Sequence, residues 1–281
     1  MNEQAADAVP RQLRQADRRH AIANAVLFEG SVRIEELAER FGISLMTAHR
    51  DLDDLESQGI LRKSRGVATA SSTSLVESSD AYRSGRQRAE KEAVARACVD
   101  YIEPGQAVFL DDSTTVRRLG RWIGAKAPLT VITNALTLLN ELKNTRDISM
   151  VGLGGTYVNW CSSFMGRITT EEISRLRADL LVMSTAAIVD DTCFHQQPET
   201  IDTKQAMFDS AARRILLADH TKFERRALHG LVSLADFDVV IVDWATPEEH
   251  VTRLRGQGVS VVVAPQASDQ GPRTAATKES E

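Results

Sequence analysis

The sequence predicts an α/β protein with a small N-terminal winged helix-turn-helix domain and a larger domain built on a mainly parallel sheet. Three observations support this fold class. Residues 34–55 have the spacing of two short helices joined by a tight turn. Residues 71–79 are small and polar and cannot bury a core. Beyond residue 86, short apolar runs rich in β-branched residues alternate with helical patterns, which is typical of a parallel sheet covered on both faces.

The composition is that of a soluble chain long enough for two domains. It has 281 residues, of which 42% are hydrophobic and 26% are charged. No apolar run approaches the roughly 18 residues that suggest a membrane helix, and residues 1–19 are polar, so no signal peptide is apparent. We therefore expect a cytoplasmic protein with no membrane partner.

The cysteines predict neither disulfides nor a metal site. Cys98, Cys161 and Cys193 are far apart in the chain and form no C-x-x-C pair, which favours reduced thiols. Cys193 and His195 could share one side of a strand, but a pair without further ligands is more often a packing feature. We expect no metal and no cofactor.

The N-terminal domain is expected over residues 17–70, after a flexible stretch at 1–16. A first helix covers about residues 17–29 and ends at Gly30. A second helix ends at Gly42, and Ser44 caps a third. The apolar positions that give the last two helices their spacing are Leu37, Ala38, Phe41, Leu45, Ala48, Leu52 and Leu55. This is a helix-turn-helix pattern.

The third helix is the expected DNA-reading element. In such a motif the second helix of the pair enters the major groove, with its early exposed side chains at the base edges. Those side chains are Ser44, Thr47, His49 and Arg50. Arg50 is the first choice for a base contact, because arginine can pair with guanine O6 and N7 through two hydrogen bonds. The alternative is a helical hairpin with a solvated charged face.

A basic turn follows the third helix and predicts a wing. Gly59 ends the helix, and an extended segment then leads to a basic turn at Arg62, Lys63 and Arg65 before Gly66. The whole chain has a net charge of −5, and residues 1–70 carry 10 basic against 11 acidic residues, so any DNA footprint must be local. Two basic groups flank the third helix: the wing, and a set before the first helix comprising Arg11, Arg14, Arg18 and Arg19.

The larger domain is expected over residues 86–265, after a linker at 71–85 and before a disordered tail at 266–281. A long helix from residue 81 carries apolar Ala89, Ala93, Val94, Ala97 and Cys98 on one face. The predicted strands are 108–110, 129–132, 148–151, 180–183, 215–218, 239–242 and 259–263. The predicted helices between them are 114–123, 135–142, 171–176, 202–214 and 247–256.

Polar residues gather where these strands end, which predicts a site for a phosphorylated small molecule. In open parallel sheets, ligands bind beyond the carboxyl ends of the strands, where helix N-termini and backbone amides favour anions. The strand-end residues are Asp111, Ser113, Thr114, Thr115, Thr133, Asn134, Gly154 and Gly155. Later candidates are Glu199, Lys204, Asp219 and Lys222, in which a lysine supplies a point charge for phosphate. The alternative is ordinary loop chemistry.

The N-terminal motif resembles a known family. Residues 18–70 resemble the N-terminal domain of the DeoR family of bacterial transcriptional regulators. That family's pattern S-x-x-T-I-R-R-D-L-x-x-L-E-x-x-G appears here from Ser44 to Gly59. Ala48 replaces the usual isoleucine and His49 the first arginine, while the wing has S-R-G-V in place of H-G-G-A. These departures bear on base preference and leave the DNA-binding class intact.

The resemblance extends over residues 86–265 to the DeoR-type effector domain, which implies the fold of ribose-5-phosphate isomerase, glucosamine-6-phosphate deaminase and the CoA transferases. The family's D-x-G-T-T, T-N and F-x-G correspond to residues 111–115, 133–134 and 164–166. Its E-x(4)-K-x-x-M and D-x-(S/T)-K correspond to Glu199, Lys204 and Met207 and to Asp219, Thr221 and Lys222. Ser113 replaces the loop glycine, and its side chain narrows the approach of a phosphate to the backbone.

Two functions from different classes follow. The first is a regulator, foremost a repressor of a carbohydrate catabolic operon, whose binding to operator DNA is modulated by a phosphorylated sugar. The second is an isomerase- or deaminase-like enzyme with an accessory DNA-binding domain, although no second acidic pair completes an isomerase site. One recognition helix and a wing bury too little surface for tight specific binding, so we expect a homo-oligomer, dimer or tetramer.

Overall fold

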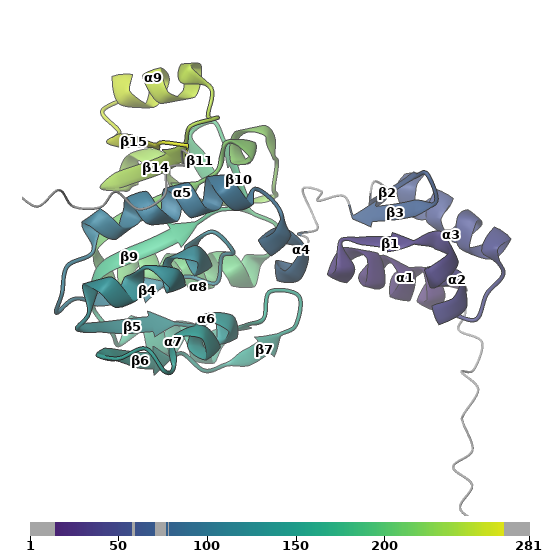
Figure 1. The fold of residues 1–281 in the computed structure, drawn as a ribbon, viewed down its shortest axis with the longest axis horizontal. Coiled ribbons are helices and arrows are strands. Elements are labelled where there is room, and N and C mark those ends of the chain that lie inside the picture. The colour runs from purple at the N-terminus through teal and green to yellow at the C-terminus, as the bar shows by residue number, and fades with distance from the viewer. Residues whose placement is uncertain (1–14, 58–59, 71–76, 78, 267–281) are drawn as a thin grey trace, which may run out of the picture. The chain divides into compact units, whose positions relative to one another are not determined.

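A computed structural model describes residues 15–57, 60–70, 77 and 79–266 (Figure 1). The chain divides into two compact units, residues 1–83 and 84–281. Each unit has its own buried apolar core. Most of the expected flexible N-terminus, residues 71–76 and 78 of the expected linker, and nearly all of the expected tail lie outside the described residues.

The first unit is a three-helix domain with a small antiparallel sheet. Its helices are α1 (Gln15–Glu29), α2 (Ile34–Arg40) and α3 (Leu45–Ser57), and its strands are β1 (Ser31–Arg33), β2 (Leu61–Ser64) and β3 (Val67–Ala70), in the order β1-β3-β2. Ile22, Leu37, Leu52 and Leu61 are almost completely buried between them. The helix-turn-helix prediction is confirmed. Leu45, expected on the apolar face, is 45% exposed, because α3 begins at this residue and its buried stripe starts at Ala48.

The wing is a tight hairpin. Ser64 pairs with Val67, which leaves Arg65 and Gly66 as a two-residue loop with φ of 49° and 77°. Positive φ at both positions is the signature of a type I′ turn, whose twist matches that of the flanking strands. The Ile34 amide donates to the Gly66 carbonyl at 2.9 Å and thus ties the loop to the start of α2.

Two helices replace the single long helix expected from residue 81. They are α4 (Asp80–Gly85) and α5 (Arg88–Cys98), and the break between them contains Gln87 in the left-handed conformation, with φ of 47°. The expected apolar face of α5 is buried at Ala93, Val94 and Cys98 and packs on the core at Ala97, but not at Ala89. Ala89 is exposed, whereas Lys91 lies in line with buried Val94 and Ala95.

The second unit is organised by a parallel sheet of seven strands, and all seven strands were predicted. Their order is β15-β14-β12-β9-β4-β5-β6, with every neighbouring pair parallel. The bounds are β4 (Ala107–Leu110), β5 (Leu129–Thr133), β6 (Ile148–Gly152), β9 (Ala178–Ser184), β12 (Ala211–Ala218), β14 (Val239–Asp243) and β15 (Val261–Ala264). The remaining helices are α6 (Leu136–Leu142), α7 (Arg167–Ser174), α8 (Pro198–Asp209) and α9 (Glu248–Gly256).

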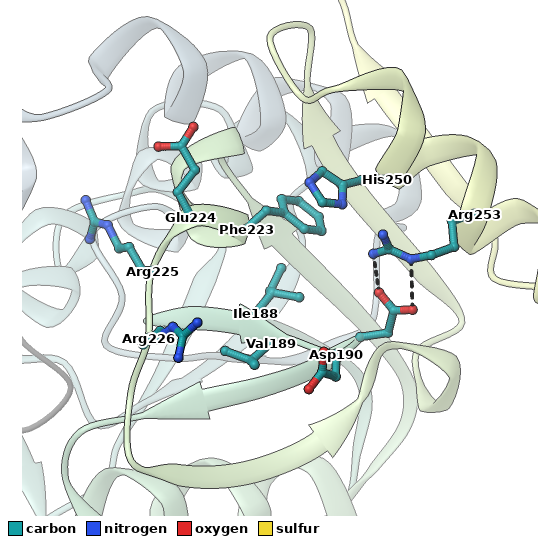
Figure 2. Close-up of a pocket in the computed structure, with 10 residues that line it drawn as sticks. Ile188, Val189, Asp190, Phe223, Glu224, Arg225, Arg226, His250 and Arg253 are labelled. Carbon is teal, nitrogen blue, oxygen red and sulfur yellow. Dashed lines mark hydrogen bonds and ion pairs between the residues drawn. The ribbon is translucent and has the colours of Figure 1, made fainter.

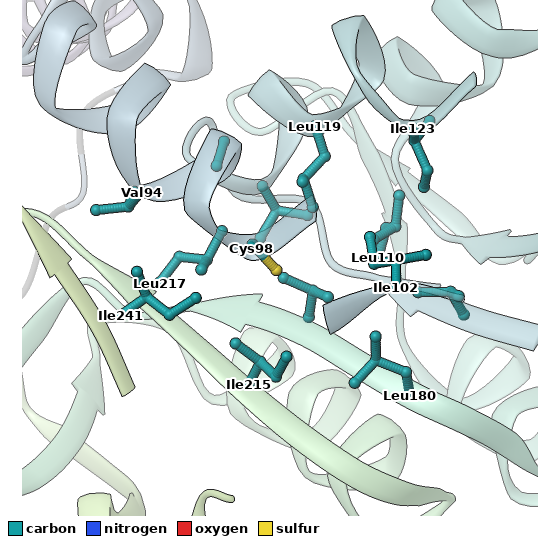
Figure 3. Packing of buried hydrophobic residues seen from close by; sticks show 14 of the residues in the cluster. Val94, Cys98, Ile102, Leu110, Leu119, Ile123, Leu180, Ile215, Leu217 and Ile241 are labelled. Carbon is teal, nitrogen blue, oxygen red and sulfur yellow. The ribbon is translucent and has the colours of Figure 1, made fainter. Parts of the chain in front are cut away.

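Side chains alternate along each strand, and helices cover both faces, so the central strands are buried on both sides. On β9, Leu180 and Val182 join the core beneath α5 and α6, whereas Leu181 and Met183 join the core beneath α7, α8 and α9. Figure 3 shows the first of these cores, in which Cys98 of α5 packs among aliphatic side chains from the strands. The three-layer arrangement confirms the predicted fold class.

Two local predictions were wrong. Residues 116–121 and 123–126 form 3₁₀ helices, and residues 211–214 belong to β12 rather than to the preceding helix. The helix α8 ends at Asp209, and Ala211 then pairs with Ala178 of β9. Two small antiparallel sheets were not predicted: β7 (Thr156–Val158) with β8 (Ser163–Met165), and β10 (Ala187–Val189) with β11 (Thr192–His195) and β13 (His229–Ser233).

The strand order reverses at β4. The chain goes from β4 to β5 and β6 on one side, and then returns to place β9, β12, β14 and β15 on the other. Ligands of open α/β sheets bind at such a switch point, beyond the carboxyl ends of the strands. Asp111 directly follows β4 and Ser184 ends β9, so these two residues mark the switch point of this sheet.

Candidate functional site

The N-terminus of α3 is fixed by a side-chain cap. The Thr47 amide donates to Ser44 Oγ at 3.1 Å, and the two hydroxyl oxygens lie 2.8 Å apart. Gly42, with φ of 60°, makes the turn that precedes the cap. The two predicted hydroxyl contacts therefore bond to each other and also define where the helix begins.

The outer face of α3 presents the predicted base-contacting residues. Arg50 is exposed and forms no ion pair among the described residues, and His49 is half-buried. Met46 is 74% exposed in the first turn of α3 and was not predicted. An apolar side chain there could contact a thymine methyl group. Its signal in the sequence is its position, since it falls outside the apolar stripe of the helix.

The inner face of α3 changes the expected role of two arginines. Asp51 is 1% exposed, and its carboxylate accepts Arg18 Nε at 2.7 Å and Arg19 Nε at 2.9 Å. Arg19 also pairs with Asp54. Burial opposes ionisation of Asp51, but the two arginines together hold its pKa below the ordinary value. Arg18 and Arg19, expected as phosphate contacts, instead join α1 to α3.

The wing retains two of its three predicted cations. Arg62 and Arg65 are exposed and form no ion pair among the described residues. Lys63 Nζ pairs with Asp53 of α3, and the Lys63 amide donates to Glu56 Oε1 at 2.8 Å. Lys63 therefore braces the wing on the helix.

A buried ion pair occupies the switch point of the sheet. The Asp111 carboxylate accepts the Ser113 amide at 3.0 Å, the Ser184 amide at 2.9 Å and the Lys204 ammonium group. Lys204 Nζ also donates to the Ser184 carbonyl at 3.2 Å and lies 3.6 Å from Asp112 Oδ1. Lys204 of α8 thus joins the ends of β4 and β9. Two carboxylates compensate its charge, which differs from the expected free point charge.

The loop after β4 is also held by a lysine that was not predicted. Lys91 of α5 is 3% exposed, and its Nζ donates to Thr114 Oγ1 at 3.0 Å. Thr115 is buried beside it, and Ser113 Oγ accepts the Val116 amide at 3.1 Å. The available signal was a lysine three and four residues before apolar Val94 and Ala95, on the buried side of a helix.

The residues after β12 form a second charged cluster. Asp219 is buried and accepts the Thr221 amide at 3.2 Å and the Thr221 hydroxyl, while Lys222 is 6% exposed. Burial opposes ionisation of Asp219, but Lys222, Thr221 and Lys91 together lower its pKa below the ordinary value. The influence of Lys91 connects this cluster to the loop after β4, since β12 and β4 both flank β9.

Asp243 at the end of β14 is a further buried carboxylate, and it was not predicted. It accepts the His220 amide at 2.5 Å and the Ala245 amide at 2.8 Å, and His220 Nδ1 lies 3.1 Å away. The signal was available, because Asp243 follows an apolar run as Asp111 and Asp219 do. All three aspartates accept backbone amides at the same edge of the sheet.

Thr133 ends β5 and Asn134 follows it, on the strand that neighbours β4. Both are completely buried, and Thr133 Oγ1 accepts the Ala135 amide at 3.1 Å. Asn134 Nδ2 donates to the Phe164 carbonyl at 2.9 Å, which ties the strand end to β8. Asn134 Oδ1 is buried and has no hydrogen-bond partner among the described residues.

The glycines after β6 serve a packing role. The Gly154 amide donates to Glu172 Oε2 at 2.9 Å, and the Gly154 carbonyl accepts the Thr169 hydroxyl at 2.7 Å. At Gly155, φ is 142°, and a Cβ would lie 2.1 Å from Thr169 Oγ1. The loop after β6 therefore packs closely on α7. The Gly154 amide, which was expected to bind an anion, already donates to the Glu172 carboxylate.

Glu199 and Lys204 do not come together. Five residues separate them on α8, which rotates their side chains by roughly 140° around the helix axis. Glu199 is exposed beside a cavity of about 390 Å³ that Trp160, Met165 and Gly166 also line, whereas Lys204 is buried at the switch point.

A larger cavity of about 580 Å³ lies between the β10–β11 turn and the segment after β12 (Figure 2). Arg253 donates to Asp191 through two nitrogens, at 2.5 and 3.2 Å. This pairing is the main reason that the pKa of Asp191 lies below its ordinary value. Phe223 stacks on His250 with ring centroids 4.5 Å apart. No sequence prediction pointed to this cavity.

No group of three or more His, Cys, Asp or Glu side chains is placed to hold a metal ion in the described part of the chain. Cys98, Cys161 and Cys193 are buried free thiols, and burial raises the pKa of Cys193 to about 12. Within the residues that the structure covers, no helix is both long enough and apolar enough to cross a membrane.

Comparisons with known proteins match both units. Residues 18–74 match the model of the DeoR-like helix-turn-helix domain, and residues 86–244 match that of the DeoR C terminal sensor domain. Similar curated proteins include the transcriptional repressor AccR of Agrobacterium fabrum, 31% identical over 82% of this chain and 90% of AccR. The glycerol-3-phosphate regulon repressor of Escherichia coli is 29% identical over 84% of this chain and 93% of its own length. The lactose phosphotransferase system repressor of Staphylococcus epidermidis is 32% identical, with coverages of 81% and 91%.

Among solved structures, ribose 5-phosphate isomerase A from Methanocaldococcus jannaschii aligns with a TM-score of 0.35 and 14% identity, over 47% of this chain and 53% of the isomerase. The eIF2B β subunit from Chaetomium thermophilum aligns with a TM-score of 0.38 and 16% identity, over 54% and 48% of the two chains.

Proposed function

Because this chain belongs to the DeoR family of transcriptional regulators, we propose that it is a repressor of a carbohydrate catabolic operon whose operator binding responds to a phosphorylated sugar. The printed names of its relatives support this proposal, since they describe repressors of glycerol-3-phosphate and lactose systems. The sugar itself and the operator sequence are properties to be measured for this chain.

The observation that carries the DNA-binding half is the exposed, uncompensated charge of Arg50 on α3. Arg18 and Arg19 of α1, on the inner side of α3, are neutralised by Asp51 and Asp54, whereas Arg50 of α3 itself has no ion pair among the described residues. Arg62 and Arg65 of the wing add charge suited to backbone phosphates. Ser44, Thr47 and His49 complete the proposed contact set.

The effector half rests on the switch point between β4 and β9. We place the sugar against Asp111 and Asn134. The buried Oδ1 atom of Asn134 could accept a hydrogen bond from a sugar hydroxyl. The phosphoryl group would lie toward the hydroxyls of Ser113, Thr114 and Thr115, near the Lys91 ammonium group. Lys204 then acts by orienting Asp111. Thr133, Asp219 and Lys222 form the surrounding polar layer.

The enzyme alternative is not supported by the acid-base candidates that the sequence named. Asp111 is bonded to Lys204, Asp219 lies against Lys222, and Glu199 faces a different side of α8 from Lys204. A general base must reach a substrate proton directly or through one water. Incubation with sugar phosphates should therefore yield no isomerisation or deamination product.

A homo-oligomer, dimer or tetramer, is the expected binding form. The helix α3 and one wing offer less surface than a tight specific complex buries, so paired domains on related half-sites are needed. Footprinting should then protect two or more similar half-sites.

The test of this proposal is an operator gel shift with DNA from upstream of this gene and its neighbours. The purified full chain should retard one such fragment, and one member of a panel of phosphorylated sugars should change the affinity. The Arg50→Ala variant should retard the fragment only at higher protein concentration while remaining folded. If the parent bound all fragments alike and no sugar phosphate changed its affinity, the proposal would be wrong.

A further inference from the structure

A third cavity, of about 550 Å³, adjoins the loop after β4. Its walls come from the start of the second unit, from α5, from the 3₁₀ helix η2 (Val116–Arg121) and from Glu141 of α6. Four guanidinium groups line it, against one carboxylate: Arg88, Arg117, Arg118 and Arg121. Its volume is within the range of small-molecule sites.

The arginines differ in how far neighbouring carboxylates compensate them. Arg117 donates to Glu141 at 2.6 Å, and Arg121 lies 3.5 Å from Glu92. Arg118 Nη2 donates at 2.6 Å to the neutral Ser84 carbonyl. Arg88 is exposed and forms no ion pair among the described residues. Two positive charges, those of Arg88 and Arg118, therefore remain uncompensated at one cavity.

The protein's own electrostatics show the effect of this crowding. Burial, together with the nearby charges of Arg121, Arg88 and Arg117, holds the pKa of Arg118 below its ordinary value, although Glu92 acts in the opposite direction. An anion in the cavity would relieve this repulsion. The Ser84 hydroxyl oxygen, also in the cavity wall, is buried without a hydrogen-bond partner among the described residues and could donate to that anion.

The cavity in Figure 2 is a natural comparison because it has nearly the same volume. It contains three arginines, Arg225, Arg226 and Arg253, but also three carboxylates, those of Asp190, Asp191 and Glu224. Arg253 is bonded to Asp191. That cavity has no excess of positive charge. The cavity at η2 has four arginines and one carboxylate in its lining, so of the two it is the one that favours an anion.

We propose that Arg88, Arg117, Arg118 and Arg121 form a second anion site that takes a phosphoryl group, either as inorganic phosphate or as a phosphate ester. A phosphoryl group carries close to two negative charges near neutral pH, which matches the two uncompensated guanidinium groups. Arginine also suits phosphate because its planar fork can donate two parallel hydrogen bonds. This site goes beyond the proposed effector site, which it borders at Thr114: Thr114 forms one wall of the cavity, and its hydroxyl accepts a hydrogen bond from Lys91.

The position of the cavity suggests a regulatory role. The first unit, which contains α3, ends at Arg83. Ser84 and Gly85 are the first residues of the second unit, and they also end α4. Since Arg118 holds the Ser84 carbonyl, a phosphoryl group bound to Arg118 would act on the segment that connects the two units.

Trp122 provides a local reporter for a test. It directly follows Arg121, and its indole Nε1 donates at 2.8 Å to Glu92, the same carboxylate that pairs with Arg121. The chain has three tryptophans, so fluorotryptophan labelling gives three ¹⁹F signals, which single Trp→Phe variants assign. Trp160 and Trp244 then serve as internal controls.

The experiment titrates the labelled full chain with inorganic phosphate, and separately with ribose 5-phosphate, up to about 10 mM. We expect the Trp122 signal to shift with both. In the double variant Arg88→Gln and Arg121→Gln, the apparent affinity from this signal should fall about tenfold or more. The matched double variant Arg146→Gln and Arg175→Gln, which removes two exposed arginines elsewhere in the same unit, should behave like the parent.

Three results would overturn the proposal: no shift of Trp122 in the parent, equal affinities in parent and arginine variant, or a shift confined to Trp160 or Trp244. Loss of operator affinity in the arginine variant without phosphate, with phosphate binding intact, would assign the arginines to DNA instead. Failure of the proposed repressor function would appear separately, as operator binding that no sugar phosphate alters.

Discussion

Arg50 and Lys204 are both cations that motifs single out for ligand contact, yet they lie in opposite environments. Arg50 is exposed on α3 without an ion pair among the described residues, whereas Lys204 is 3% exposed and bonded to Asp111 at the switch point of the sheet. The difference teaches that a motif identifies a charged position but does not tell whether its charge is available. Whether the charge is available depends on carboxylates such as Asp111, which lies 93 residues from Lys204 in the chain.

The comparison predicts its largest effect at Lys204. The Lys204→Met substitution should lower the free energy of unfolding by about 3–5 kcal/mol, because it leaves the buried Asp111 carboxylate without a cation. Urea denaturation of the full chain measures this loss. Adding Asp111→Asn should recover part of it, and Lys143→Met on the exposed end of α6 should have little effect. A loss below about 1 kcal/mol would mean that the ion pair contributes little.

The next effect concerns Asp51. It is a buried carboxylate that pairs with cations from another helix, as Asp111 does at the end of β4. Its pKa lies below its ordinary value of 3.8 in the folded chain, so its stabilising contribution is present above that pH and is lost as the pH falls through the folded pKa. Asp51→Asn should cost about 1.5–3 kcal/mol near pH 7, since it removes two hydrogen bonds to charged groups. It should also flatten the acid side of the stability curve.

The control for Asp51 lies on the same helix. Asp53 has a 58% exposed side chain paired with Lys63, so Asp53→Asn should change stability by no more than about 1 kcal/mol. If both variants lost the same free energy of unfolding, the inner and outer faces of α3 would not differ as we describe. Thermal unfolding of both variants, at pH 7 and at a pH well below 3.8, measures this distinction.

Arg50 should show the reverse of Lys204, an effect on DNA without an effect on folding. We expect Arg50→Ala to weaken operator binding by about 1–3 kcal/mol and to relax the preference at one base pair, as for the loss of a bidentate base contact. Arg50→Lys keeps the charge but not the fork, and should recover only the non-specific part. Fluorescence anisotropy with single-base operator variants measures both, and unchanged specificity in Arg50→Ala would refute the contact.

The smallest expected effect is a difference between Arg62 and Lys63 of the wing in the salt dependence of DNA binding. Arg62→Ala should reduce the salt dependence of DNA binding by about 0.9 units of log K per log salt, the value for one phosphate contact. Lys63→Ala should reduce it less, because Lys63 is already paired with Asp53. Equal slopes for the two variants would show that the ion pair opens on DNA.

The fold was largely predictable because its strongest signals are local. All seven strands of the parallel sheet are short apolar runs, and the helix-turn-helix has a regular apolar stripe with Ser44 as its cap. The small sheet of β10, β11 and β13 was missed, because residues 192–195 pair with residues 229–233 and such a distant partner leaves no pattern in either segment.

The site was less predictable for the same reason. The motifs identified Asp111 and Lys204, but their pairing joins residues 93 apart in sequence, which cancels the charge on which the anion prediction rested. Lys91 looked like an ordinary surface lysine of α5 and is buried against Thr114. The pairing of Arg18 and Arg19 with Asp51 likewise depends on how α1 packs on α3.

The central claim is that a phosphorylated sugar bound by the second unit controls DNA binding by the first. Reciprocity tests it most directly, because coupling between two equilibrium binding sites must have the same size in both directions. The measurement is the affinity of the full chain for its operator with and without the effector, beside the affinity for the effector with and without operator. The account predicts the same factor in both pairs, about 5-fold or more, and loss of the effect on DNA in Asn134→Leu. A factor of one in either pair would contradict it.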